Sequence, residues 1–130
     1  MIIELVDGLL QTTIKINYKG QALTIDKLVI DTGASHTLLS ADAVADIGVY
    51  FENGDEIISA IGIGGEESCF RKAFDSVTLG NFQVGNFKLD VGALHEKLEI
   101  NGLLGLDLLM AANIVLDLSE LVMYTTKGKS

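Results

Sequence analysis

The fold is decided by one stretch of the sequence, Leu28-Val29-Ile30-Asp31-Thr32-Gly33-Ala34-Ser35-His36-Thr37-Leu38-Leu39. Its first three residues form a continuously apolar run, which is typical of a strand buried in a core. An aspartate, a Thr-Gly turn and a second apolar segment follow. The pattern predicts a buried strand that delivers the carboxylate of Asp31 into a tight loop.

Two interpretations of Asp31 are open at this point. An aspartate in Asp-x-Gly often caps a turn through its own carboxylate, and the bare tripeptide is a weak signal of function. Alternatively, Asp31 is a reactive group presented at the end of its strand. The rest of the sequence has to decide between the two.

Alternation of apolar and polar residues surrounds this stretch. In Thr13–Tyr18, the side chains of Ile14 and Ile16 fall on one face, as a half-buried strand requires. Lys19-Gly20-Gln21 predicts a hairpin turn into a second strand, Ala22–Ile30. Further strands are expected at Ile57–Ile63, Cys69–Leu79 and Phe82–Val91, with the pairs Gly80-Asn81 and Gly85-Asn86 interrupting the last two.

Helical patterns are short. One covers Ser40–Asp46, with Ser40 as N-cap and Gly48 as its stop, and another covers Leu106–Ala112. The chain then returns to strand patterns at Ile114–Leu118 and Leu121–Tyr124. We therefore expect one mainly β domain, of the all-β class, over residues 1–130, with one or two short helices and a frayed tail at 126–130.

Composition narrows the function. The chain of 130 residues is 48% hydrophobic and 21% charged, as in a globular protein. Its 9 basic and 18 acidic residues give a net charge of −9, which disfavours nucleic acid and anionic membranes as partners. The single cysteine, Cys69, cannot form an intrachain disulfide, and we see no secretory signal or uninterrupted membrane span. We expect a cytoplasmic protein.

The segment around Asp31 resembles the active-site loop of the aspartic proteases, in which apolar residues precede Asp-Thr-Gly and a further apolar strand follows. A second segment, Ile100–Leu109, resembles the family's other landmark, an apolar pair followed by a glycine at the start of a short helix. The order and spacing of these motifs are similar to those of the single-domain, retropepsin-like branch. That resemblance implies a half-barrel with a flap hairpin.

The resemblance implies an aspartic endopeptidase that works as a homodimer on a peptide or protein substrate. Hydrolysis in this class needs a water held between two carboxylates. Two carboxylates this close cannot both be ionised, so they share one proton. One chain supplies only one of them, Asp31. An isologous two-fold dimer supplies the second. No cofactor and no metal are expected, because no His/Cys/Asp cluster has metal-ligand spacing.

Other residues take roles by matching position. The resemblance implies that Thr32 hydrogen-bonds across the dimer axis, that Gly33 lets backbone approach the carboxylates, and that Gly105 packs behind the loop. Ala34 replaces a hydroxyl residue that many acid-acting members use, so activity nearer neutrality is expected. Ser35 and His36 occupy the positions at which the viral enzymes carry two acidic residues that bind the substrate backbone.

The flap is expected at a glycine-rich stretch, Ile61-Gly62-Ile63-Gly64-Gly65. The alternative is an ordinary mobile hairpin tip. A dinucleotide-binding interpretation is poor, because Glu66 and Glu67 follow where a phosphate would sit.

Two further interpretations remain beside the protease. One is a dimeric peptide-binding module of the same fold that has lost turnover, since the flap and the substrate-grip positions depart from the viral pattern. The other is an aspartyl-phosphate enzyme, which needs a βα unit that the strand pattern after Asp31 does not offer. For His36 we expect a loop position facing water or substrate, and for Cys69 a packing role.

Overall fold

The computed structural model describes residues 1–62, 65–94 and 97–126, and the side chains of these except 60–62 and 65–67. Its central element is the hairpin of β2 (Leu9–Tyr18) and β3 (Gln21–Ile30). The turn between them has φ of 48° at Lys19 and 82° at Gly20. Positive φ at both central turn residues suits a tight hairpin, because it follows the twist of the strands.

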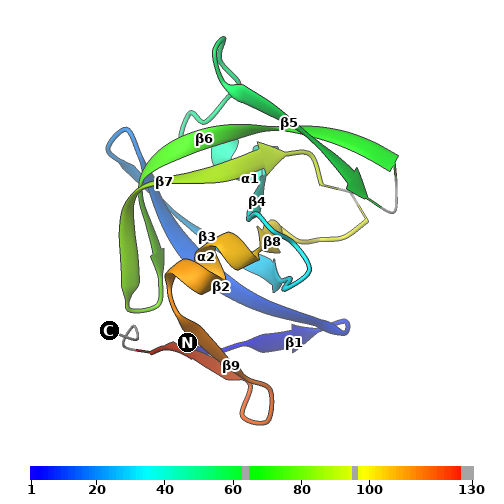
Figure 1. Cartoon of the computed structure of the whole chain (residues 1–130), viewed down its shortest axis with the longest axis vertical. Helices are drawn as coiled ribbons and strands as arrows, with labels where there is room; N and C mark the ends of the chain where they lie inside the picture. Colours follow the sequence, from blue (N-terminus) through cyan, green and yellow to red (C-terminus); the bar gives the residue numbers. More distant parts are fainter. Residues whose placement is uncertain (63–64, 95–96, 127–130) are drawn as a thin grey trace.

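Eight strands form one sheet in the order β1-β2-β3-β8-β4-β7-β6-β5 (Figure 1). An additional pairing of β2 with β6 brings distant parts of the sheet together, so that it curls into a partial barrel. The mainly β, half-barrel prediction is confirmed. The remaining strands of this sheet are β1 (Glu4–Val6), β4 (Leu38–Ser40), β5 (Glu56–Gly62), β6 (Gly65–Leu79), β7 (Phe82–Gly92) and β8 (Gly102–Leu104).

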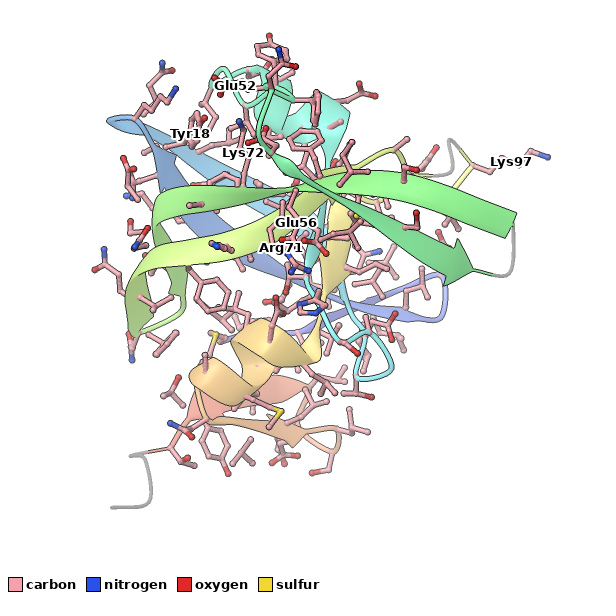
Figure 2. The ribbon with its side chains drawn as sticks, turned by 45° about the horizontal axis from the view of Figure 1, so that its top comes forward. Tyr18, Glu52, Glu56, Arg71, Lys72 and Lys97 are labelled. Carbon is pink, nitrogen blue, oxygen red and sulfur yellow. The ribbon has the colours of Figure 1, made fainter. Side chains whose placement is uncertain are left out.

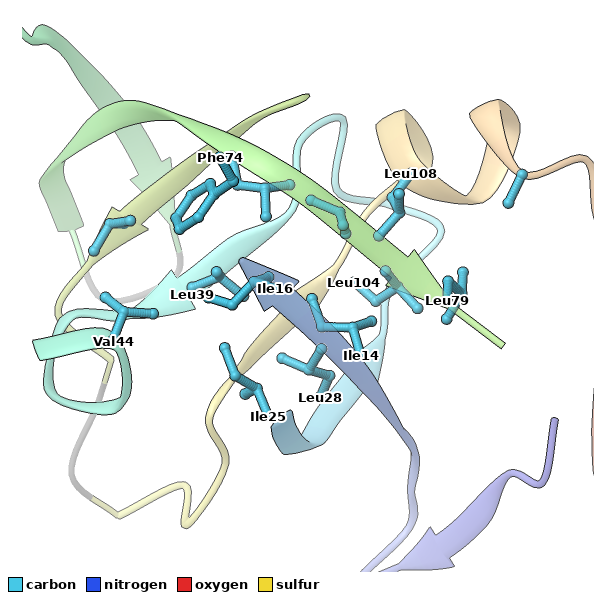
Figure 3. Close-up of a cluster of buried hydrophobic side chains, with 14 of the residues drawn as sticks. Ile14, Ile16, Ile25, Leu28, Leu39, Val44, Phe74, Leu79, Leu104 and Leu108 are labelled. Carbon is cyan, nitrogen blue, oxygen red and sulfur yellow. The ribbon is translucent and has the colours of Figure 1, made fainter. Parts of the chain in front are cut away.

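The core lies inside the curl of the sheet (Figure 3). Ile14 and Ile16 from β2 are fully buried there, as their alternation predicted. Apolar side chains of β3, β4, β6, β8 and helix α2 (Leu106–Ala111) pack against them, namely Leu28, Leu39, Phe74, Leu104 and Leu108. Since Leu28 and Leu104 flank the loop that carries Asp31, the packed core fixes the base of that loop.

Both expected helices are present and short. Helix α1 (Ala41–Ala45) begins after Ser40, whose side chain accepts a hydrogen bond from the backbone N–H of Ala43 at 3.4 Å. Helix α2 (Leu106–Ala111) follows Gly105. After it, β9 (Ile114–Asp117) and β10 (Val122–Thr125) form a separate two-stranded sheet. No helix in the described part of the chain is long and apolar enough to cross a membrane.

Three details differ from the sequence-based expectations. The pair Gly85-Asn86 does not interrupt β7, because the strand continues through Asn86 at φ 51°. Thr126 is anchored, since its backbone N–H and its hydroxyl both donate to the carbonyl of Asn113 at 3.0 Å. The rest of the predicted tail, 127–130, lies outside the described residues.

The third difference concerns the two ends of the chain, 1–5 and 121–124, whose β-prone sequences predict that they pair across the axis of a dimer. In the structure they pair within the chain: Ile2 bridges Val122, and the N–H of Met123 donates to the carbonyl of Met1 at 2.9 Å. The strand propensity was correct, but a partner within the same chain satisfies these backbone groups.

Candidate active site

Asp31 is placed by the end of β3. This strand runs parallel to β8, with Ile30 opposite Leu104, and the backbone N–H of Asp31 donates to the carbonyl of Leu104 at 2.9 Å. The chain then turns sharply, since the N–H of Ala34 donates to the carbonyl of Asp31 at 3.1 Å. A buried strand therefore delivers the carboxylate to a tight loop, as predicted.

The carboxylate is oriented by its own loop. Its Oδ1 accepts a hydrogen bond from the backbone N–H of Gly33 at 3.0 Å, and a side chain at position 33 would place Cβ only 3.2 Å from the same oxygen. Asp31 is half-buried, whereas Thr32, Gly33 and Ser35 are exposed. Among the described residues the other carboxylate oxygen has no hydrogen-bond partner. One oxygen is thus fixed and the other is free to bind a reactant.

Gly105 lies directly behind this loop. A Cβ there would lie 2.7 Å from the carbonyl carbon of His36 and 2.9 Å from the carbonyl oxygen of Ala34. The start of α2 continues the contact, because the N–H of Leu106 donates to the carbonyl of Ala34 at 2.8 Å and that of Asp107 to Ser35 at 3.2 Å. Only glycine permits this close packing of helix against loop.

Two residues that the sequence did not single out as site residues hold the loop in place. Thr37 is fully buried, and both its backbone N–H and its hydroxyl donate to Oδ1 of Asp107, at 2.9 and 2.7 Å. The hydroxyl oxygen also accepts from the N–H of Gly105 at 3.0 Å. An acidic residue in the first turn of a helix is a recognisable signal, but its partner, 70 positions away, is not.

His36 lies at the edge of this network. Its Nδ1 is 4.0 Å from Oδ2 of Asp107, and its side chain is about half exposed. The structure therefore places His36 in the loop, where it faces water and an acidic neighbour.

The expected flap is the hairpin of β5 and β6, which projects from the sheet on the side where the loop between β3 and β4 lies (Figure 1). Gly62 pairs with Gly65 at the last described rung of this hairpin. Ile63 and Gly64 lie outside the described residues, and so does the side chain of Ile61. Gly62 and Gly65 thus end the described part of a long hairpin, and its role as a flap stays a prediction.

Ion pairs of Arg71 fix the base of this hairpin, and Figure 2 shows Arg71 beside Glu56. The Nε of Arg71 in β6 lies 2.8 Å from Oδ1 of Asp90 in β7, and Asp90 is buried. Glu56 of β5 adds a contact of 3.6 Å to Arg71. The N–H of Asp90 in turn donates to the carbonyl of Thr37 at 3.1 Å. Strand β6 is therefore connected to the loop of Asp31 through Asp90 and Thr37.

A second cluster fixes the same strand to the loop after α1 (Figure 2). The buried amine of Lys72 lies 2.7 Å from carboxylate oxygens of both Glu52 and Asp55. Burial lowers the pKa of Lys72, but the hydrogen bonds to the two carboxylates outweigh it, so that its pKa is raised overall. The same hydrogen bonds lower the pKa of Glu52 and of Asp55.

Cys69 is half-buried beside Gly92, where an added Cβ would lie 2.9 Å from the Cβ of the cysteine. Burial raises the pKa of its thiol, and the charge of Asp90 raises it further. The thiol is thus less reactive than an exposed one, in keeping with a packing role. Within the described ranges, no three His, Cys, Asp or Glu side chains gather as they would to hold a metal ion.

The partly closed sheet, the Asp-Thr-Gly loop and the glycine behind it agree with the resemblance to the aspartic proteases. The model of the aspartyl protease family matches residues 12–108, which is most of the chain. The chain belongs to the aspartyl protease family.

The fold agrees with that assignment. The crystal structure of a retropepsin-like aspartic protease from Rickettsia conorii is similar, with a TM-score of 0.68 and 24% sequence identity over 94% of this chain and 86% of that chain. The search of curated proteins gave no significant match. The retropepsin-like resemblance is confirmed.

Proposed function

We propose that this chain is one subunit of a homodimeric aspartic endopeptidase in which Asp31 is the catalytic residue. The observation that carries the proposal is the setting of the Asp31 carboxylate. Gly33 holds one oxygen at 3.0 Å, while the other has no partner among the described residues. A group that only capped its turn would not need Gly105 and Thr37 to brace the loop from behind.

The chemistry requires a second carboxylate. Asp31 of the partner subunit would lie across a two-fold axis and share one proton with the first. The ionised member takes a proton from the bound water, which attacks the peptide carbonyl carbon, and the protonated member donates to the carbonyl oxygen. The carboxyl that took the proton from water then donates it to the peptide nitrogen while the other carboxylate takes a proton back from a hydroxyl of the tetrahedral intermediate, so that the C–N bond breaks and a neutral amine leaves.

An apolar hollow beside Thr32 supports dimerisation on this face. It has a volume of about 360 Å³ and is lined by Thr32 and by residues of α2 and the start of the second sheet, including Leu106, Leu109 and Ile114. Met110, at its edge, is 70% exposed. In the described part of the chain, β9 pairs only with β10, so its other edge is open to a partner. A second copy seated here would bring the two loops together.

An extended peptide would lie between the flap hairpin and the loop. Its backbone can pair with exposed strand edges, while its side chains point alternately to opposite sides. This geometry suits an endopeptidase, because it presents the middle of a chain to the carboxylates.

The decisive experiment is Asp31→Asn in the full chain. The amide oxygen can still accept from Gly33, so folding and dimerisation should persist. The rate of hydrolysis of an extended apolar peptide should fall by a factor of about 10² to 10⁴. Asp46→Asn, an exposed aspartate after α1, is the control and should cleave normally.

Equal cleavage by Asp31→Asn and wild type, in a preparation free of other proteases, would show that Asp31 is only a turn residue. A wild-type dimer that binds peptides without cleaving any would instead support the peptide-binding module.

A further inference from the structure

A groove lies along the first strands of the sheet and is separate from the hollow at Thr32. Its volume is about 580 Å³, and it is formed by the first three strands and the segment 97–100. Apolar side chains contribute to its walls, among them Leu9, Leu98 and Ile100.

Strand register places this groove next to the reactive carboxylate. Gln11, in the groove wall, pairs with Val29 across the β2–β3 ladder. Directly paired residues lie on the same face of a sheet, and so do residues two apart along a strand. Asp31 is two residues beyond Val29, so Gln11 and Asp31 share a face, separated by about 7 Å along the strand direction.

Gln11 is the unusual residue of the groove. It is only 8% exposed, yet its carboxamide has no hydrogen-bond partner among the described residues. In the described part of the chain the one buried side-chain polar atom without a partner is Oγ1 of Thr125, so the carboxamide of Gln11 is open to solvent through the groove and can bind a ligand there. Because Gln11 lines the groove, a polar group entering the groove can meet it.

Charge decides which polar group this is. Four acidic residues line the groove against two basic ones, Lys27 and Lys97, and the whole chain carries −9. An anionic ligand is therefore disfavoured, and a cation can use the carboxamide oxygen of Gln11 as an acceptor. The four acidic residues are Glu4, Asp7, Asp26 and Glu99.

We infer that this groove binds a basic side chain, lysine or arginine, of the substrate, within one or two residues of the scissile bond. The inference rests on the proposed peptidase function and specifies its substrate class. The aliphatic stem of such a side chain lies along Leu9, Leu98 and Ile100, and its charged head reaches Gln11 and the acidic rim. A purely apolar side chain would fill the walls but leave Gln11 without a partner.

The test is designed to be independent of turnover. The Asp31→Asn protein serves as a binder that does not cleave. It is titrated with three fluorescent extended peptides that carry lysine, norleucine or glutamate next to the scissile bond. Two further sets of peptides carry the varied residue one and two positions farther from that bond. At one position or more, the lysine peptide should bind about fivefold more tightly than the norleucine peptide, and the glutamate peptide more weakly than both. The lysine preference should shrink at high salt.

Two variants then locate the effect. In Gln11→Leu and in Glu99→Gln, each combined with Asp31→Asn, the lysine to norleucine ratio should fall towards one, whereas Glu120→Gln, on the turn between β9 and β10, should leave it unchanged.

Equal affinity for the lysine and norleucine peptides at every position, or no measurable binding of any peptide, would overturn the inference. Failure of the proposed function looks different, because it is the wild-type protein leaving all peptides uncut. A preference that survives both groove variants would place the basic side chain elsewhere and would also reject this groove as its site.

Discussion

Thr37 donates two hydrogen bonds to a single oxygen of Asp107, from its backbone N–H at 2.9 Å and from its hydroxyl at 2.7 Å. The same hydroxyl oxygen accepts from the N–H of Gly105, and the same carboxylate oxygen accepts from the N–H of Leu108 at 2.7 Å. Every polar atom of the threonine side chain is therefore used. The loop of Asp31 and the start of α2 form one hydrogen-bonded unit.

Thr37→Val should destabilise this unit. The substitution keeps the shape but leaves the buried N–H of Gly105 without its acceptor, and we expect a loss of about 1–3 kcal/mol in the free energy of unfolding. Peptidase activity should fall as well, because the loop loses its brace. Denaturant unfolding measures the first effect, and Thr24→Val, at an exposed strand position, should change it by less than about 0.5 kcal/mol. An unaltered Thr37→Val protein would contradict the bracing role.

Gly105→Ala should displace the loop. The new Cβ would lie 2.7–2.9 Å from backbone atoms of His36 and Ala34, which cannot move aside as a side chain could. We expect about 1–3 kcal/mol of destabilisation and a marked loss of cleavage. In the control Gly85→Ala, the added Cβ meets its nearest atom at 3.6 Å. Similar thermal unfolding of both variants would show that the loop tolerates displacement.

Met110→Glu should weaken the proposed dimer. Placing a charge at the edge of the hollow beside Thr32 would bury it against apolar side chains, so the dimer dissociation constant should rise about tenfold or more. Specific activity should then fall as the protein is diluted. Sedimentation velocity measures the dissociation, with Tyr50→Glu, at an exposed tyrosine after α1, as the control. A dimer of unchanged affinity would move the interface to another face.

Lys72→Met should change the response of stability to acid. In the folded protein Lys72 lowers the pKa of Glu52 and Asp55 from ordinary values of 4.5 and 3.8. Their stabilising contribution is therefore present above these values and is lost as the pH falls through the lowered ones. The variant should be less stable at pH 7 and should lose less stability below about pH 4.5.

Urea unfolding at a series of pH values gives both curves. Lys15→Met, at an exposed position of β2, should follow the wild type. Parallel curves for Lys72→Met and wild type would mean that the cluster contributes no acid dependence.

Local patterns predicted most of the strands. Period-two alternation predicted the second part of β2 but missed its start at Leu9, whereas the bounds of β3 were predicted to within one residue. Asp31 and Gly105 were predicted to lie together because each belongs to a short motif of the aspartic proteases, and the resemblance to that family implies that the two motifs pack against each other. The partners of the chain ends were not found, since strand propensity does not specify which edge a strand joins.

The polar contacts of the site were beyond the sequence for a similar reason. Thr37 and Asp107, like Arg71 and Asp90, come together only when the sheet has its final register. Nor could Gln11 be recognised as buried, because an alternating strand gives no sign that a loop 86–89 residues later will form a groove with it.

The two ion clusters on β6 hold this strand at one place along its length. Arg71 is fixed to Asp90 and Lys72 to Glu52 and Asp55, so the strand is clamped at two successive residues. Beyond them the strand continues as Gly65–Phe70, and six residues of strand span about 20 Å. Arg71 is in turn connected to Thr37, because Asp90 accepts from Arg71 and its backbone N–H donates to the carbonyl of Thr37. A displacement of this outer part would therefore act on Asp90 and Thr37, and through them on the loop that holds Asp31.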